Sequence, residues 1–303
     1  LKKFYLKPNK SGVIVYSVHV PYMLTGLIIS RIFNIDYIAV WTDPPAVSTI
    51  YESGLKSKLR SFELKLSKYL MKKATKVIAV TKYLAEDFAP GKPYLIIEGI
   101  INIDDISHLS KSEKKFTNDV IKIVYTGSLE KRYGIKNIVD GFILLKEKNA
   151  VLEIYGRGDF ENELLVITKH KHNVKYKGFL PNDEILKVQR EADFLINARS
   201  SKEEFVKYSF PSKTLEYMIS GTPLITTILP GIPDEYKDYV IVLDDNNPET
   251  IAKKLKEVLE YSNNECINIG LKARQFAETK NYISQARKII DFLGESKSGV
   301  IEK

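Results

Sequence analysis

The chain has 303 residues, of which 44% are hydrophobic and 28% are charged, and its formal net charge is +8. This length exceeds what one ordinary compact core needs and predicts two domains, and the composition is that of a globular protein. Because the sequence contains no uninterrupted run of about 18 apolar residues, it excludes a helix that spans a bilayer.

The cysteine and histidine content excludes further classes of protein. A single cysteine, Cys266, cannot form an internal disulfide, and the four histidines have no spacing typical of a zinc site. The first residues are charged and polar where the apolar segment of a signal peptide would lie. We therefore expect a soluble protein of the reducing cytoplasm, with no bound metal.

Positive charge is concentrated in residues 56–76, where eight Lys or Arg accompany one acid, Glu63. Apolar residues recur through this segment at helical spacing, which predicts a basic amphipathic helix. One interpretation is that Lys56–Lys76 lies on an anionic membrane surface, on the inner face of the membrane. The other is a helix that packs on the core and leaves its lysines in solvent. No basic and aromatic motif accompanies the charge, so we expect no nucleic acid partner.

Short apolar runs alternate with helical patterns along the whole chain, which is typical of parallel βαβ units. The runs are rich in Val and Ile, as in strands that are buried on both faces. The expected strands are residues 13–16, 37–41, 76–80, 94–97, 121–125, 151–155, 174–177, 194–197, 223–226 and 239–242. The sequence therefore predicts an α/β fold.

A polar stretch without periodicity, residues 108–119, predicts the link between the two domains. We expect a first domain of residues 1–115, a second of residues 116–280, and a final helix with a tail, residues 281–303, that returns to the first domain. The first domain has about four expected strands and no glycine-rich loop after an opening strand. It is therefore either small or without its opening strands.

Glycines follow three of the expected strands, at Gly127, Gly156 and Gly178. Gly127 precedes Lys131 and Arg132 and then a helix, an arrangement that favours binding of a diphosphate or other anion. Gly156 and Gly158 flank Arg157, which suits close approach to phosphate or ribose. Each segment is equally compatible with an ordinary turn between a strand and a helix.

The segment Pro211–Gly221 carries a denser signal. Pro211 and Ser212 mark the start of a helix and Gly221 marks its end. Lys213 in the first turn opposes the helix dipole unless an anion binds there, and Glu216 one turn later is a natural partner for ribose hydroxyls. The alternative is a surface ion pair between Lys213 and Glu216.

Several motifs in this order resemble those of a known family, the retaining family 4 glycosyltransferases of the GT-B fold. The motifs are YTGSL, YGRGD, KGFLP, EADFLIN and FPSKTLEYMISGTPLI, between residues 121 and 236. The resemblance implies two Rossmann-like parallel-sheet domains that face a cleft, with a sugar nucleotide on the second domain and the acceptor on the first, which is shortened here.

The resemblance also implies site residues. Glu216 matches the glutamate that holds the ribose hydroxyls, Gly127 the glycine under the diphosphate, and Phe179 the residue whose backbone faces the base. The implied nucleotide-sugar site consists of Gly127, Ser128, Gly156, Arg157, Phe179, Ser212, Thr214 and Glu216. In the first domain, Asp43 matches one half of a His-Asp pair that faces the acceptor. Its alternative role is to cap a helix.

The sequence departs from the family pattern at three positions. Ser128 and Tyr133 stand where the family has an arginine and a lysine, so we expect Lys131, Arg132 and Lys213 to supply the charge that stabilises the departing diphosphate. Tyr208 stands where the family has its first glutamate, and Glu203 or Glu204 is the candidate replacement.

Together, these features predict a retaining hexosyltransferase. The donor would be a UDP- or GDP-linked sugar and the acceptor a glycan or a lipid-linked carbohydrate, in the synthesis of cell-surface polysaccharide or glycolipid. No cofactor or metal is expected. The alternatives are a truncated protein that binds a nucleotide sugar without catalysis and, with less support, a sugar-nucleotide epimerase on the same scaffold.

Overall fold

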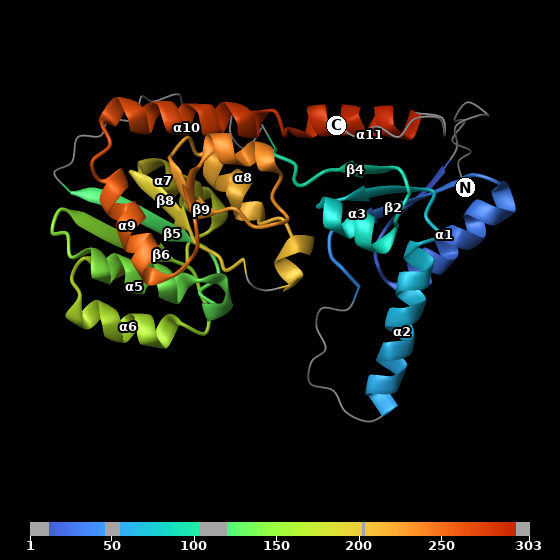
Figure 1. Ribbon diagram of the computed structural model, residues 1–303, viewed down its shortest axis with the longest axis horizontal. Coiled ribbons are helices and arrows are strands. Elements are labelled where there is room, and N and C mark those ends of the chain that lie inside the picture. Colours follow the sequence, from blue (N-terminus) through green and yellow to red (C-terminus); the bar gives the residue numbers. More distant parts are fainter. Residues whose placement is uncertain (1–11, 46–54, 103–119, 202–203, 295–303) are drawn as a thin grey trace. The chain divides into compact units, whose positions relative to one another are not determined.

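The computed structural model describes residues 12–45, 55–102, 120–201 and 204–294. The chain forms two compact units (Figure 1): residues 1–100, 205–210 and 282–303 make the first, and residues 101–204 and 211–281 make the second. Each unit contains one parallel sheet with helices, so the predicted α/β class with two Rossmann-like domains is confirmed. The expected boundary near residue 115 lies outside the described residues.

The sheet of the first unit contains β1 (Gly12–Tyr16), β2 (Asp36–Trp41), β3 (Lys76–Ala79) and β4 (Tyr94–Ile96) in that order. All three strand pairs are parallel. Each strand begins and ends within one residue of the expected range. Short Val, Ile and Ala runs form the two central strands, β2 and β3, which are buried on both faces.

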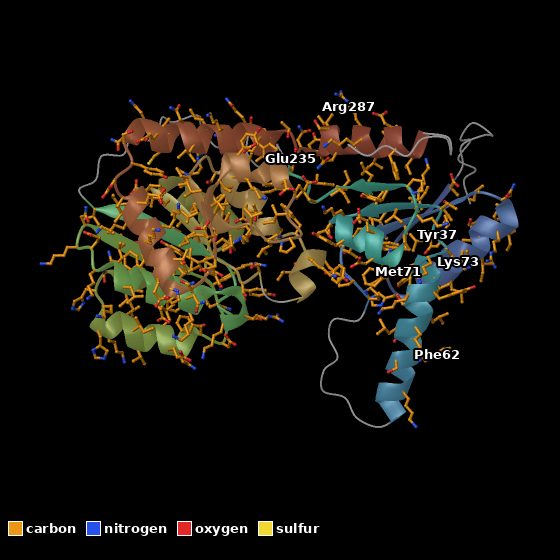
Figure 2. All side chains as sticks on the ribbon, viewed as in Figure 1. Tyr37, Phe62, Met71, Lys73, Glu235 and Arg287 are labelled. Carbon is orange, nitrogen blue, oxygen red and sulfur yellow. The ribbon has the colours of Figure 1, made fainter. Side chains whose placement is uncertain are left out.

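Helices α1 (Val20–Phe33), α2 (Leu55–Met71) and α3 (Lys82–Phe88) cover one face of this sheet. Tyr37 and Met71, both fully buried, belong to that core (Figure 2). Thr81 caps α3, since its hydroxyl accepts a hydrogen bond from the backbone N–H of Leu84 at 3.3 Å. The last helix, α11 (Tyr282–Gly294), covers the other face of the sheet.

Within the described residues, β1 is the first strand of its sheet. One edge of β1 pairs with β2, and no described residue pairs with the other edge. Ile14 and Tyr16 on β1 are 54% and 71% exposed. On α1, apolar side chains are also exposed: Tyr22, Leu24, Ile28, Ile32 and Phe33. A helix that is apolar on all sides is typical of a buried position, so this face of the first unit is unusual.

The predicted basic helix is confirmed as α2, although its apolar stripe is only partly buried. Leu70 is buried and Leu66 is partly buried. Phe62, by contrast, is 66% exposed (Figure 2). The helix therefore packs on the core through its last turns and leaves an aromatic side chain among lysines in solvent.

The second unit contains a sheet of six parallel strands: β5 (Ile121–Thr126), β6 (Ala150–Tyr155), β7 (Val174–Tyr176), β8 (Phe194–Asn197), β9 (Leu224–Thr227) and β10 (Ile241–Leu243). Their order is β10-β9-β8-β5-β6-β7, so the sheet is built outward in both directions from β5 and β8. Each strand lies within two residues of its expected range. Such a change in direction creates a ligand site at the carboxyl ends of the strands.

Helices lie on both faces of this sheet (Figure 1). One face carries α5 (Ile135–Leu145), α6 (Glu161–His170) and α9 (Pro248–Val258), which share the main core with the strands. The other helices are α7 (Asn182–Glu191), α8 (Ser212–Ile219) and α10 (Asn263–Glu278). Short 3₁₀ helices occupy Lys131–Tyr133, Glu204–Tyr208 and Asp234–Tyr239. Over the described ranges, no helix is both long enough and apolar enough to cross a membrane.

Candidate functional site

The predicted nucleotide-sugar residues of the second unit include three that follow the carboxyl ends of strands in its sheet. Gly127 follows β5, Gly156 follows β6 and Phe179 lies just beyond β7. These three strands are neighbours and parallel, so the segments after them leave the sheet side by side. Helix α8, which carries Glu216, lies near the same strand ends, because the hydroxyl of Tyr217 on α8 donates a hydrogen bond to the carbonyl of Thr126, the last residue of β5.

The glycines pack these loops against one another. The backbone N–H of Gly127 donates to the carbonyl of Tyr155 at 3.0 Å, and that of Gly156 donates to Gly178 at 2.9 Å. Gly156 has φ +148°, and a Cβ at this position would lie 1.8 Å from the carbonyl oxygen of Gly127. The sequence predicted close approach of backbone to a ligand; in the structure, the absence of a side chain at Gly156 is needed for contact between two loops.

A buried tyrosine supports the loop after β5. The hydroxyl of Tyr125 donates to the carbonyl of Ser128 at 2.7 Å. Burial raises the pKa of Tyr125 to about 12, so the hydroxyl stays protonated and keeps donating. The backbone of Ser128 is thereby fixed, while its own hydroxyl accepts a long bond from the N–H of Glu130 at 3.4 Å.

The two cations that follow Gly127 already have carboxylate partners. The ammonium of Lys131 forms an ion pair with Glu163, and the hydrogen bond from Lys131 to that carboxylate is the main cause of its raised pKa. Arg132 pairs with Glu130 at 2.6 Å and stacks on the ring of Tyr133, 4.9 Å from its centroid. Both pairs are exposed, so either cation can exchange its partner for an anionic ligand at little cost.

The predicted helix start at Ser212 is confirmed. Helix α8 begins there after Pro211 and ends at Ile219, and Gly221 follows with φ +76°. The ammonium of Lys213 lies 2.7 and 2.8 Å from the two carboxylate oxygens of Glu216. About 30% of the Glu216 side chain is exposed, which leaves part of the carboxylate accessible to a ligand.

A residue that the sequence did not identify holds Glu216 in place. Gln189 on α7 is fully buried, and its amide donates to Glu216 at 2.6 Å and to the hydroxyl of Thr126 at 2.8 Å. The hydroxyl of Tyr217, beside Glu216, donates to the carbonyl of Thr126 at 2.5 Å. The carboxylate is therefore fixed to the end of β5. The sequence did contain a signal for this role, because Gln189 is a polar residue one helical turn after the apolar Ile185 and so lies on the buried side of α7.

The remaining predicted residues of this unit have distinct environments. Arg157 lies over the ring of Phe179, 4.9 Å from its centroid, and this ring is 60% exposed. Ser212 is exposed at the start of α8. Thr214 is buried, and its hydroxyl has no hydrogen-bond partner among the residues that the structure describes.

Asp43 and Tyr208 belong to the first unit. Asp43 is exposed after β2 and accepts a hydrogen bond from the hydroxyl of Thr42 at 2.8 Å. Tyr208 donates to Asp87 at 2.8 Å and packs its ring on Phe88, with centroids 5.4 Å apart. Of the two glutamates considered as replacements, residue 203 lies outside the described residues, and of residue 204 only the backbone is described.

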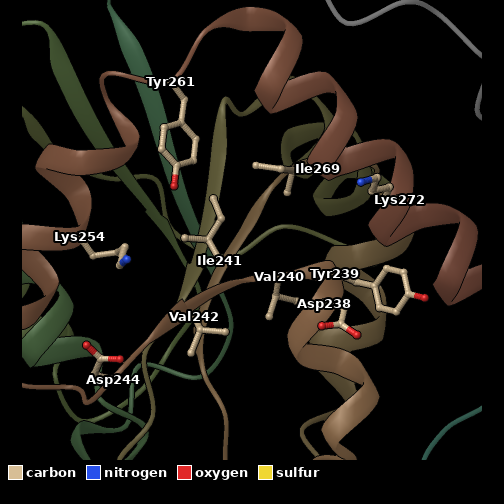
Figure 3. Close-up of a pocket in the computed structure, with 10 residues that line it drawn as sticks. All are labelled: Asp238, Tyr239, Val240, Ile241, Val242, Asp244, Lys254, Tyr261, Ile269 and Lys272. Atoms are coloured by element: carbon tan, nitrogen blue, oxygen red, sulfur yellow. The ribbon is translucent and has the colours of Figure 1, made fainter.

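A pocket of about 490 Å³ lies in the second unit along the edge strand β10 (Figure 3). Tyr239, Ile241, Tyr261 and Ile269 contribute much of its wall, and Lys254 and Lys272 lie at its border. None of the predicted site residues lines this pocket. The pocket is therefore separate from the candidate site at the carboxyl ends of β5 and β6.

Comparisons with known proteins agree with this architecture. The family model described as glycosyl transferases group 1 matches residues 108–276, more than half of the chain. No curated protein sequence matches the chain. Among solved structures, HepE from Anabaena in complex with UDP has a TM-score of 0.68 at 17% identity, over 92% of this chain and 78% of HepE.

Two further solved structures have the same fold. Sucrose-phosphate synthase from Thermosynechococcus elongatus has a TM-score of 0.66 at 15% identity, over 92% of this chain and 72% of that protein. TarM from S. aureus has a TM-score of 0.60 at 17% identity, over 88% of this chain and 53% of TarM. The chain thus belongs to the glycosyl transferases group 1 family and is a glycosyltransferase of the GT-B fold.

Proposed function

We propose that this protein is a retaining glycosyltransferase of family 4 that transfers a hexosyl group from a UDP-linked sugar to a hydroxyl of a glycan or lipid-linked acceptor. The observation that carries the proposal is the carboxylate of Glu216, partly exposed and held by Gln189 and Lys213 at the edge of the sheet where β5 ends. HepE, which shares the fold, has been solved with UDP and with UDP-glucose. These complexes favour uridine over guanosine as the base.

Each predicted residue has a role in this proposal. Glu216 accepts hydrogen bonds from the two ribose hydroxyls, an interaction suited to a fixed carboxylate with free lone pairs. The backbone at Gly127, Ser128 and Gly156 faces the diphosphate, and that of Phe179 faces the base. Arg157, Ser212 and Thr214 complete the nucleotide-sugar site.

Cationic side chains stabilise the leaving diphosphate in place of a metal ion. As the bond between the sugar and the diphosphate breaks, negative charge grows on the phosphate oxygen, and nearby cations lower the energy of that state. Lys131, Arg132 and Lys213 have this role, and they exchange their present carboxylate partners for phosphate. Asp43 of the first unit binds a hydroxyl of the acceptor.

The first test is a thermal shift with UDP-, GDP-, ADP- and CMP-linked sugars on the native chain, on Glu216→Ala and on Glu260→Ala. A ligand that binds only the folded state raises the melting temperature in proportion to occupancy. We expect a UDP-sugar to stabilise the native chain and Glu260→Ala, whose exposed glutamate lies outside the site. Glu216→Ala should lose the response. Equal stabilisation of all three proteins, or of none, would contradict the proposal.

A second candidate function is binding of a nucleotide sugar without turnover. The observation that favours it is that Ile14 and Tyr16 on β1 are 54% and 71% exposed, an apolar surface on the unit proposed to bind the acceptor. Release of UDP from a UDP-sugar in the presence of glycan or lipid-linked acceptors distinguishes the two candidates. Binding with no release across the acceptors would favour the second.

We propose further that the protein works in the synthesis of cell-surface polysaccharide or glycolipid, with α2 against the anionic inner face of a membrane. Phe62 and Tyr69 are exposed on this helix, and Lys65, Lys68 and Lys72 are exposed near them. Aromatic side chains among lysines are typical of helices that lie in a bilayer interface.

Vesicle co-sedimentation tests this contact. Binding to phosphatidylserine vesicles should weaken with salt and with the triple reversal Lys65→Glu, Lys68→Glu and Lys72→Glu. The matched control reverses Lys253, Lys256 and Lys272, which are exposed in the second unit. Salt-independent binding, or equal loss in both triple variants, would contradict a specific contact through α2.

A further inference from the structure

The three cations of the proposed diphosphate site all have carboxylate partners in the structure. Lys131, Arg132 and Lys213 each form an ion pair with a carboxylate in the structure. Ser128 and Tyr133 carry no charge, so the loop after β5 offers a cation only when Lys131 or Arg132 releases its carboxylate partner. A departing diphosphate requires positive charge that is already in position when the bond breaks.

Arg199 lies beside this loop, although it comes from a different strand. It follows β8, the neighbour of β5 in the centre of the sheet. Its guanidinium carbon is 4.5 Å from the centroid of the Tyr133 ring. The backbones are also in direct contact, since a Cβ on Gly134 would lie 2.0 Å from the carbonyl oxygen of Ala198.

The same guanidinium acts on the other side of the loop. Its positive charge lowers the pKa of Tyr125, against the larger effect of burial. A Cβ on Gly127 would lie 3.2 Å from the hydroxyl of that tyrosine. Arg199 is therefore close to both residues that flank the glycine loop, Tyr125 at the end of β5 and Tyr133 before α5.

The backbone of Arg199 is fixed by the neighbouring strand. Its N–H donates to the hydroxyl of Thr227 at 3.1 Å, and the same hydroxyl donates to its carbonyl at 2.7 Å. The side chain is not satisfied in the same way: Nε is buried and has no hydrogen-bond partner among the described residues. A buried donor without a partner is costly, and a ligand oxygen would remove that cost.

We propose that Arg199 also binds the diphosphate of the donor, as a cation that is in position before Lys131, Arg132 and Lys213 exchange their carboxylate partners for phosphate. The inference rests on the proposed function, because it names a further residue of the same nucleotide-sugar site. A guanidinium can bind two phosphate oxygens at once through its planar fork, which a lysine cannot do.

Isothermal titration with UDP, UMP and uridine tests this role on the native chain, Arg199→Ala, Arg199→Lys and the control Arg287→Ala. Arg287 is exposed on α11 of the first unit (Figure 2), so its loss removes the same charge away from the site. We expect Arg199→Ala to weaken UDP binding on the order of 10- to 100-fold, as for loss of bonds to a charged group. Uridine affinity should stay within about twofold, because uridine has no phosphate.

The outcomes separate the inference from the function on which it rests. If Arg199→Ala binds UDP as the native chain does, or loses UDP and uridine equally, Arg199 does not bind the diphosphate. Arg199→Lys guards against misfolding: we expect it to keep the native melting temperature without ligand and to bind UDP with intermediate affinity. A native chain that does not bind UDP refutes the proposed function itself, and the role of Arg199 with it.

Discussion

Two glycines with the same backbone conformation provide a direct test of the packing at the candidate site. Gly134 has φ +85° and Gly178 has φ +76°, so an alanine at either position is held in the left-handed region. Their surroundings differ. A Cβ on Gly134 would lie 2.0 Å from the carbonyl oxygen of Ala198, whereas nothing lies within 4 Å of a Cβ on Gly178.

The expected magnitudes follow from this difference. Gly178→Ala costs only the left-handed conformation, about 1–2 kcal/mol, and at about 2–4 °C per kcal/mol should lower the melting temperature by roughly 2–8 °C. Gly134→Ala adds overpacking against backbone that cannot rotate away, about 1–3 kcal/mol. Its total is therefore about 2–5 kcal/mol, or roughly 4–20 °C.

Thermal unfolding by circular dichroism measures both values, and a UDP titration extends the comparison. Moving Gly134 away from Ala198 also moves Tyr133 away from Arg199, so we expect Gly134→Ala to bind UDP more weakly than Gly178→Ala does. Equal melting temperatures for the two variants would show that the loop relaxes freely. The inference that Gly134 packs tightly against the carbonyl of Ala198 would then be refuted.

Three further outcomes are expected. Gln189→Leu removes the bond to Glu216 and should weaken UDP binding roughly 2- to 12-fold by titration calorimetry, from about 0.5–1.5 kcal/mol per hydrogen bond, with little change in melting temperature. Burial raises the pKa of Tyr37 and Tyr125 to about 12, above the unfolded value, so the folded chain retains protons that the unfolded chain loses and its stability should fall as the pH rises above about 10. Tyr125→Phe should reduce that alkaline loss in denaturant titrations at pH 9 and pH 11. Phe142→Ala, in the main core of the second unit, should lower the free energy of unfolding by about 3–5 kcal/mol.

The strands could be predicted from the sequence because the signal that defines them is local. Continuous Val and Ile runs occur wherever a parallel strand is covered on both faces, and ten such runs became ten strands. The start of α8 was predictable for the same reason, since Pro211 and Ser212 adjoin it. The exposure of Ile14 and Tyr16 could not be predicted. Both belong to an apolar run typical of a buried strand, and only the strand order of the described residues places β1 at the end of the sheet.

The pairing of charges at the site could not be predicted, because it depends on contacts between distant segments. Lys131 and Glu163 are 32 residues apart, and Gln189 and Glu216 are 27 apart. A lysine that looks free in the sequence can therefore already have a partner. Arg199 was missed for the converse reason: no motif marks it, and its relation to Tyr133 arises from the adjacency of β5 and β8.

The first unit takes its last helix from the far end of the chain, and this affects how the protein is made. One apolar face of its sheet is covered by side chains of α11, with a core of Ile38, Ile78, Ile97, Ile289, Phe292 and Leu293. At about 5–20 residues per second, roughly 10–40 s of synthesis separate β4 from α11. During that interval the nascent sheet keeps an uncovered face, so we expect the second unit to fold first and the first unit to depend on chaperones until α11 has been synthesised.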